Sequence, residues 1–171
     1  IISTTGYTSR EIFQLREDYN LKKGKDFYMV GGMGHASIVA LGNSLQNNKQ
    51  IFCLDGDGSV LMHMGSLRTI SKFAGGNFKH LLFNNYCHES VGGQPTVGHN
   101  INFHKIAKEA GYGLVIIAKT YTQVLNGIKK MEAYREGASL MEVKISQGTR
   151  KDLGRPKHSP IENKILLMKN I

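Results

Sequence analysis

The sequence predicts a three-layer, doubly wound α/β fold, in which a mostly parallel sheet carries helices on both faces. Two observations support this. Short apolar runs alternate along the chain with stretches of helical pattern, which is typical of a covered parallel sheet. The 171 residues show no internal repeat or low-complexity tract, and this length suits one compact domain. We therefore predict a single domain over residues 1–171.

The predicted strands are short and largely apolar, as expected for strands buried on both faces. They cover residues 27–30, 50–54, 80–83, 114–117 and 140–145, with a further short strand at residues 1–2.

Helices are predicted between these strands. Thr8 and Glu11 have the spacing of a capping box at the start of the first helix. Residues 148–160 contain two prolines and several basic side chains, so we expect a surface connection there. The predicted helices cover residues 9–19, 36–45, 62–73, 103–110, 121–134 and 160–168.

The formal net charge of +9 indicates a basic surface. We interpret it as matched to an anionic cofactor or a neighbouring domain rather than to nucleic acid, because the basic residues form no stripe interleaved with aromatic side chains. They lie scattered near the ends of elements and in the C-terminal tail. Examples are Lys22, Lys23, Lys25, Lys129, Lys130, Arg150, Lys151, Arg155 and Lys157.

Composition also narrows the class of protein. No apolar run is long enough for a membrane span. Cys53 and Cys87 make no disulfide framework, which favours a reduced, cytoplasmic protein. Because the chain starts at Ile1 and shows no signal peptide, we expect a fragment, a processed subunit or an excised domain.

Polar residues gather at the predicted carboxyl ends of two neighbouring strands. Residues 54–59 read Leu-Asp-Gly-Asp-Gly-Ser, and Asn84-Asn85 end the next strand. Open α/β sheets bind ligands at these strand ends. A carboxylate such as Asp57 and an amide oxygen are suitable ligands for Mg²⁺ held against a diphosphate.

A glycine-rich turn at Gly31-Gly32-Met33-Gly34 follows a strand and opens a helix, so its backbone amides can face an anion. With Asp55 as a ribose-binding acid, the turn resembles a degraded dinucleotide fingerprint. A dinucleotide-binding module is therefore an alternative of a different class, although it leaves Asn84-Asn85 unexplained. A tight turn that only packs helix against strand is a third interpretation.

Gly56-Asp57-Gly58 followed by Asn84-Asn85 resembles the signature of thiamine-diphosphate-dependent enzymes, specifically of their diphosphate-binding domain. Longer matches lie at residues 4–11, 31–37, 54–65 and 88–96. Together they are similar to the C-terminal half of the decarboxylases that act on phosphonopyruvate, with sulfopyruvate decarboxylases as close relatives. The resemblance covers about residues 4–144.

The resemblance implies a set of roles at the cofactor. Asp57 and the Asn85 side chain would bind Mg²⁺ together with the main-chain carbonyl of Cys87. Gly58 and Ser59 would contact the diphosphate of thiamine diphosphate.

Residues of the two preceding loops complete the implied cofactor site. Thr8 or Ser9 would reach the diphosphate from the first loop. Met33 would hold the cofactor in its bent conformation, and the Gly31 carbonyl would accept a hydrogen bond from the aminopyrimidine. Asn84 would organise the turn rather than bind metal.

The polar, glycine-rich loop 87–96 is the candidate for substrate binding. His88, Ser90 and Gln94 are candidates either to bind the phosphonate or carboxylate of the substrate or to supply a proton, and His88 is the candidate catalytic residue. A solvated turn that merely closes over the cofactor is the alternative. Tyr86 departs from the family, whose members tend to have glycine at this position.

The family places the cofactor between this domain and a preceding pyrimidine-binding domain, which supplies a glutamate and is absent from this sequence. The resemblance thus implies a decarboxylase that converts phosphonopyruvate to phosphonoacetaldehyde and CO₂. A sulfopyruvate decarboxylase-like domain or subunit is the alternative. We expect the chain alone to be inactive, and the complete protein to be a homo-oligomer without nucleic-acid or membrane partners.

Overall fold

The computed structural model describes residues 1–21, 25–169 and 171, so Lys22 and Lys23 of the charge interpretation lie outside the described residues. Its centre is a six-stranded sheet in the order β2-β1-β3-β4-β8-β7. Every pair of neighbouring strands in it is parallel, which confirms the predicted parallel sheet. The strands are β1 Ile2–Ser3, β2 Phe27–Tyr28, β3 Ile51–Gly56, β4 Phe78–Asn84, β7 Leu114–Ala118 and β8 Ser139–Lys144.

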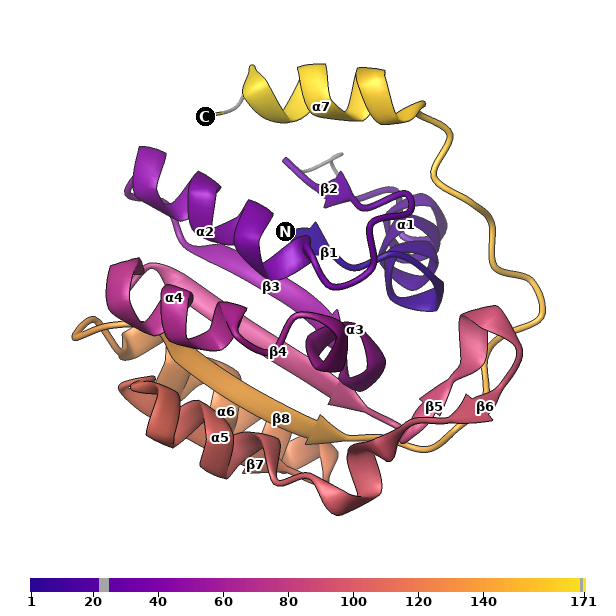
Figure 1. Cartoon of the computed structure of the whole chain (residues 1–171). Coiled ribbons are helices and arrows are strands. Elements are labelled where there is room, and N and C mark those ends of the chain that lie inside the picture. The colour runs from indigo at the N-terminus through magenta and orange to yellow at the C-terminus, as the bar shows by residue number, and fades with distance from the viewer. Residues whose placement is uncertain (22–24, 170) are drawn as a thin grey trace.

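Helices cover both faces of the sheet (Figure 1). On one face Ala40, Ile70 and Phe103, from α2, α4 and α5, join one buried apolar cluster. On the other face Ile12 of α1 and Met131 of α6 belong to a second cluster. The helices are α1 Tyr7–Asp18, α2 Ala36–Gln46, α3 Asp57–Met62, α4 Ser66–Phe73, α5 Phe103–Ala110, α6 Tyr121–Ala133 and α7 Pro160–Met168.

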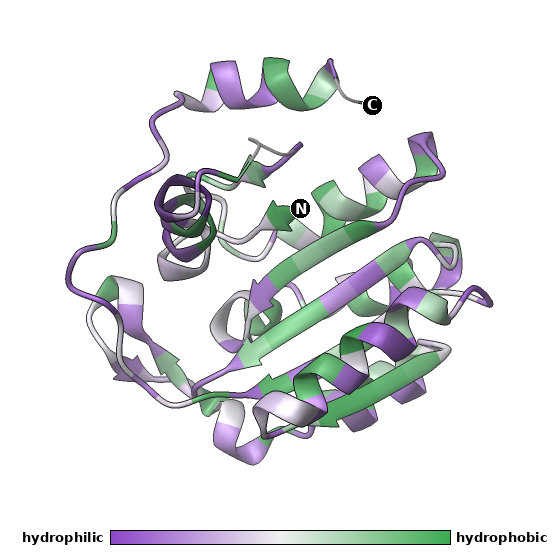
Figure 2. Cartoon of the chain, turned by 180° about the vertical axis from the view of Figure 1, so that it is seen from behind, coloured by the Kyte–Doolittle hydropathy of each residue, from purple (hydrophilic) through white to green (hydrophobic). Residues whose placement is uncertain are grey.

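The central strands are mostly hydrophobic, whereas the helices alternate between hydrophobic and hydrophilic residues (Figure 2). This pattern follows from burial of the strands between two layers of helices. The three-layer α/β prediction is therefore confirmed.

Two local predictions were wrong. The helix predicted over residues 62–73 is two helices, because His63 adopts a non-helical conformation (φ −137°, ψ 47°) and α3 has already begun at Asp57. The capping box at Thr8 and Glu11 is absent, because Gly6 precedes α1 with φ 94° and the helix begins at Tyr7 without a side-chain cap.

The segment after β4 is more structured than the predicted loop. Strand β5 (Cys87–His88) pairs antiparallel with β6 (Gln94–Pro95), so this segment turns back on itself. A 3₁₀ turn follows at Val97–Asn100. The hairpin thereby returns the chain to the carboxyl end of the main sheet.

The connection between β8 and α7 runs along the surface past the β5–β6 hairpin and α1 (Figure 1), as predicted. The Gly154 amide donates to Gln14 Oε1 at 3.0 Å, and Arg150 pairs with Asp18 of α1 at 3.3 Å. This connection therefore closes one side of the region where β3 and β4 end.

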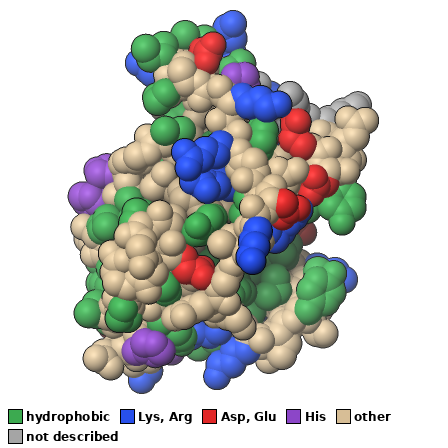
Figure 3. Space-filling model, turned by 90° about the vertical axis from the view of Figure 1, so that its right-hand side faces the viewer, with side chains coloured by type: hydrophobic (Ala, Val, Ile, Leu, Met, Phe, Trp, Pro, Cys, Tyr) green, Lys and Arg blue, Asp and Glu red, His purple; other side chains and the backbone are tan. Residues whose placement is uncertain are grey.

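On the face shown in Figure 3, basic side chains lie among acidic, apolar and other groups. The described part of this face therefore carries no continuous basic stripe of the kind that follows a nucleic-acid backbone. No described helix combines the length and apolar character needed to cross a bilayer.

Candidate functional site

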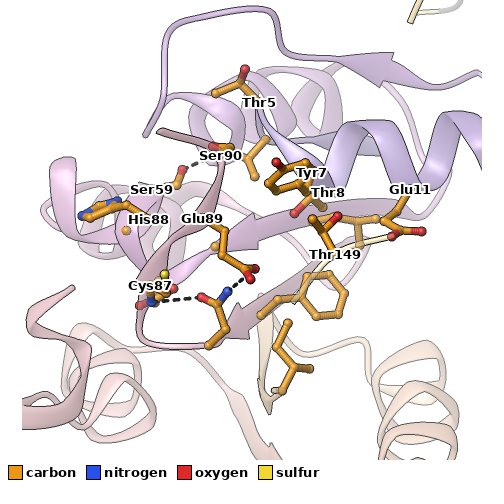
Figure 4. Close-up of a pocket in the computed structure, with 18 of the residues that line it drawn as sticks. Thr5, Tyr7, Thr8, Glu11, Ser59, Cys87, His88, Glu89, Ser90 and Thr149 are labelled. Carbon is orange, nitrogen blue, oxygen red and sulfur yellow. Dashed lines mark hydrogen bonds between the residues drawn. The ribbon is translucent and has the colours of Figure 1, made fainter. Parts of the chain in front are cut away.

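A cavity of about 370 Å³ opens at the carboxyl ends of β3 and β4, a volume in the range of small-ligand sites. Figure 4 shows Tyr7 and Thr8 of α1, Ser59 of α3, and His88 and Glu89 of the segment after β4 around it. The cavity thus combines the loop before α1, the β3–α3 junction and the chain that follows β4.

Asp57 is the first residue of α3 and lines this cavity with only 2% of its surface exposed. Thr96 Oγ1 donates a hydrogen bond to Asp57 Oδ2 at 2.5 Å. Burial raises the pKa of the Asp57 carboxyl, and the hydrogen bonds from Thr96 and the Gly58 amide offset part of that effect. The Asp57 carboxylate, which lines the cavity, is thereby held in place by Thr96 through its Oδ2.

Asn85 and Cys87 line the same cavity as Asp57. Asn85 Oδ1 accepts a hydrogen bond from the Cys87 amide at 3.1 Å, and Asn85 Nδ2 donates to Glu89 Oε2 at 2.8 Å. Because Glu89 holds the nitrogen end of the amide, the oxygen end is kept on the Cys87 side. Oδ1 retains a second lone pair that can bind a cation.

Asn84 has a different role from its neighbour. Its Nδ2 donates to Glu142 Oε1 at 2.9 Å, and its Oδ1 accepts from the Tyr86 amide at 3.2 Å. Asn84 is fully buried and is not among the residues that line the cavity. It therefore organises the turn after β4.

The β3–α3 junction is shaped by small residues. A Cβ on Gly58 would lie 2.4 Å from His88 Cε1, so glycine alone lets the imidazole rest against the start of α3. Ser59 Oγ accepts hydrogen bonds from Thr4 Oγ1 and from the Gly34 amide, each at 3.0 Å. Ser59 thus ties three loops together, and its hydroxyl can still donate to a bound oxygen.

The other sequence-predicted residues divide into two groups. Met33, Thr8, His88 and Ser90 line the cavity together with Asp57, Gly58, Ser59, Asn85 and Cys87. Gly31, Ser9 and Gln94 are not among the lining residues.

These three have other surroundings. Gly31 is exposed with φ 71°. Ser9 is buried in α1, where its hydroxyl donates to the Gly6 carbonyl at 2.9 Å. Gln94 is exposed on β6.

Asp55 does not fit the role of a ribose-binding acid. It is fully buried, and its Oδ2 faces His80 Nε2 at 3.5 Å. Its Oδ1 accepts from the Gly56 amide at 3.0 Å, and His80 Nδ1 lies 3.1 Å from the Tyr112 hydroxyl. The dinucleotide interpretation therefore loses its acidic residue, since Asp55 belongs to a polar network inside the core.

The sequence did not reveal two residues of the site, Thr96 and Glu89. Neither belongs to the Gly-Asp-Gly or Asn-Asn motif. Thr96 reaches Asp57 because the chain folds back after β4, whereas Glu89 contacts Asn85 from four residues further along the chain. The family resemblance at residues 88–96 covers both positions, but it did not specify a partner for either side chain.

The donor set suits Mg²⁺ and a diphosphate. A carboxylate, an amide oxygen and a backbone carbonyl are hard oxygen ligands, which Mg²⁺ prefers together with phosphate oxygens and water. Asp57, Asn85 and Cys87 supply one such group each around one cavity. The residues present therefore fit this metal and its anionic ligand.

Comparison with known proteins agrees with this geometry. The sequence model of the family described as thiamine pyrophosphate enzyme, C-terminal TPP binding domain, matches residues 5–143. A 2-oxoglutarate:ferredoxin oxidoreductase structure from Magnetococcus marinus superposes with a TM-score of 0.61 at 15% identity, covering 75% of this chain and 50% of that one. At this identity the structural match supports the fold alone.

Two groups of relatives share more of the sequence. A phosphonopyruvate decarboxylase from Streptomyces viridochromogenes is 37% identical over 162 residues, which cover 95% of this chain and 39% of that protein. The sulfopyruvate decarboxylase subunit beta of Methanocaldococcus jannaschii is 32% identical over 156 residues, 84% of this chain and 80% of that subunit. The chain thus spans about two fifths of the Streptomyces relative and most of the archaeal subunit.

Proposed function

The chain belongs to the family of thiamine pyrophosphate (TPP) enzymes, in which it corresponds to the C-terminal TPP-binding domain, and we propose that it binds TPP, also called thiamine diphosphate, together with Mg²⁺ in the cavity beside Asp57. The observation that carries this proposal is that Asp57, Asn85 and Cys87 line one cavity from the ends of two adjacent strands.

The chain's own residues have distinct tasks in this proposal. Asp57, Asn85 Oδ1 and the Cys87 carbonyl hold the cation. Gly58 and the Ser59 hydroxyl receive the diphosphate, because both lie at the start of α3 beside Asp57.

Met33 lines the cavity from the glycine-rich turn and orients the cofactor by apolar contact. When bound, the cofactor supplies an electron-accepting ring that takes up the electron pair left as CO₂ departs from a 2-keto acid. Precise placement of the reacting groups is itself a large source of rate acceleration.

His88 and Ser90 are the proposed substrate residues of this chain. Both line the cavity, and the His88 ring is held against Gly58. The imidazole nitrogens and the Ser90 hydroxyl can form hydrogen bonds to an acidic group of the substrate.

The proposed reaction is the decarboxylation of phosphonopyruvate to phosphonoacetaldehyde and CO₂. Similarity to the Streptomyces phosphonopyruvate decarboxylases supports it. Sulfopyruvate is the second candidate substrate, because the match to a subunit beta covers 80% of that chain. A phosphonate carries about one more negative charge than a sulfonate near neutral pH, so assays with each acid separate the two candidates.

The complete enzyme is proposed to contain a pyrimidine-binding domain, in the same or another chain, and to be a homo-oligomer. The greater length of the Streptomyces relatives supports a further domain in the same chain, and the name subunit beta of the archaeal relatives supports a separate partner subunit. A cytoplasmic location is part of the proposal and is supported by two free, buried cysteines.

The test is calorimetric titration with thiamine diphosphate of the chain together with its pyrimidine-binding domain, with and without Mg²⁺. Asp57→Ala should abolish the Mg²⁺-dependent part of binding, whereas Glu109→Ala, an exposed position on α5, should leave it intact. Equal affinity in the wild type and Asp57→Ala would reject the metal assignment.

A further inference from the structure

Tyr86 lies in an unfavourable backbone conformation between two residues of the proposed metal site. Its φ is 62°, in the left-handed region that bulky side chains rarely adopt. Asn85 and Cys87 flank it, and both line the cavity. The direction of the Asn85 amide and the Cys87 carbonyl therefore depends on what holds Tyr86.

The backbone of Tyr86 is held on both sides. Its amide donates to Asn84 Oδ1 at 3.2 Å, and its carbonyl accepts from the Thr96 amide at 2.9 Å. Asn84 presents its oxygen to Tyr86 because its nitrogen donates to Glu142 Oε1 at 2.9 Å. Glu142 thus selects the orientation of the amide that supports the turn.

The ring of Tyr86 is held by a second set of contacts. It stacks on His99, with ring centroids 3.9 Å apart and an interplanar angle of 14°. Lys144 Nζ lies 4.7 Å from the ring centroid, within the range of a cation–π contact. Lys144 Nζ also lies 2.6 Å from Glu142 Oε1, so Glu142 joins the backbone contacts to the ring contacts.

Glu142 is fully buried on β8, and a third donor, His104 Nδ1, lies 3.1 Å from its Oε2. Neither Glu142 nor Lys144 is among the residues that line the cavity. A buried carboxylate with three partners is suited to fix its neighbours rather than to react.

We propose that Glu142 is a positioning residue of the metal site: with Asn84 and Lys144 it clamps Tyr86 in the left-handed conformation and thereby aims Asn85 Oδ1 and the Cys87 carbonyl at the cation. This inference rests on the proposed function, since it concerns the same metal. A glycine at position 86 adopts a positive φ without strain, so it would not need the clamp.

A double-mutant cycle tests this dependence. Mg²⁺ affinity is measured in the presence of thiamine diphosphate for the chain with its pyrimidine-binding domain, in the wild type, Glu142→Gln, Tyr86→Gly and the double variant. Glu142→Gln should weaken Mg²⁺ binding by about 10- to 100-fold, the usual effect of losing an outer contact. Tyr86→Gly should bind as the wild type does, and the double variant should lie within about threefold of Tyr86→Gly. Equal losses in Glu142→Gln and the double variant would overturn the clamp.

A readout without ligand separates this inference from the proposed function. Crystal structures of the wild type and Glu142→Gln should show Tyr86 leaving the positive-φ region in the variant. Retention of the wild-type turn would overturn the inference even if cofactor binds. If the wild type fails to bind Mg²⁺ but the turn still depends on Glu142, the metal assignment fails and the conformational clamp stands.

Should Glu142→Gln fail to fold, Lys144→Met provides the second variant, because it removes the ring contact and leaves the bond between Asn84 and Glu142 in place. It should weaken Mg²⁺ binding less than Glu142→Gln, and Tyr86→Gly should suppress that loss. A loss that Tyr86→Gly does not suppress would contradict the clamp.

Discussion

The Thr96 hydroxyl donates a hydrogen bond to the Asp57 carboxylate across 39 residues of sequence, at 2.5 Å. The β5–β6 hairpin makes this possible, because it returns the chain from Cys87 to Pro95 beside the start of α3. The bond holds Oδ2 of a carboxylate that lines the cavity.

Thr96→Val should weaken the metal site. Loss of the hydrogen bond removes a contact that lowers the pKa of Asp57, so that pKa should rise further. Mg²⁺ affinity near neutral pH should fall about 10-fold or more. Calorimetry measures the loss, and Thr96→Ser, which keeps the hydroxyl, should bind as the wild type does. Equal behaviour of the Val and Ser variants would contradict this role.

Gly58→Ala should impair cofactor binding by displacing His88, because the added Cβ would lie 2.4 Å from the imidazole Cε1. Gly42→Ala is the matched control, since a Cβ at this helical position meets no atom within 4 Å among the described residues. The control should raise the free energy of unfolding by about 0.5–1 kcal/mol. Urea unfolding and thiamine diphosphate titration of both variants test the contrast. The prediction fails if Gly58→Ala binds like the control.

Glu142 should contribute to the acid sensitivity of folding. Burial raises the pKa of Glu142, but hydrogen bonds from Lys144, Asn84 and His104 outweigh it, so the pKa lies below its ordinary 4.5. The stabilisation is therefore fully present above about pH 4.5 and is lost as pH falls through the lower folded-state pKa. As the pH is lowered from 6 to about 3, the free energy of unfolding should fall less steeply in Glu142→Gln than in the wild type. An unchanged slope would show that Glu142 gains no such stabilisation.

Lys79 should make stability depend on pH in the basic range. Its side chain is fully buried and donates to the Tyr134 carbonyl at 2.8 Å. Burial, with a smaller effect of Arg135, lowers the pKa of Lys79 to about 8. The folded state then binds fewer protons than the unfolded chain above that pH, so stability should rise between about pH 8 and 10.5.

Lys79→Met should abolish that rise and raise stability at neutral pH by up to about 3 kcal/mol. The Tyr134 carbonyl keeps a donor, since Arg135 Nη1 lies 3.1 Å away. Thermal unfolding over this pH range provides the measurement. A variant that keeps the wild-type rise would exclude Lys79 as its source.

The sequence predicted the parallel sheet because apolar strand runs and helical periodicity are local signals. It also placed Asp57 and Asn85 at adjacent strand ends, and both line one cavity. The capping box predicted from the spacing of Thr8 and Glu11 was wrong, because the backbone conformation at Gly6 sets where α1 begins.

The contacts that orient the site could not be predicted in this way. Thr96 reaches Asp57 only because the chain folds back after β4, and Glu142 reaches Asn84 through the pairing of β8 with β4. Two-residue strands such as β5 and β6 have no periodicity to recognise. The left-handed turn at Tyr86 carries a residue type that argues against it.

The central claim is that Asp57, Asn85 and the Cys87 carbonyl hold one cation. Anomalous diffraction from Mn²⁺, substituted for Mg²⁺ in crystals of the chain with its pyrimidine-binding domain and thiamine diphosphate, tests it most directly. A single peak within about 2.4 Å of oxygens from all three residues is the predicted result. A peak bound elsewhere, or one that leaves Asp57 or Asn85 out of its coordination shell, would contradict the account.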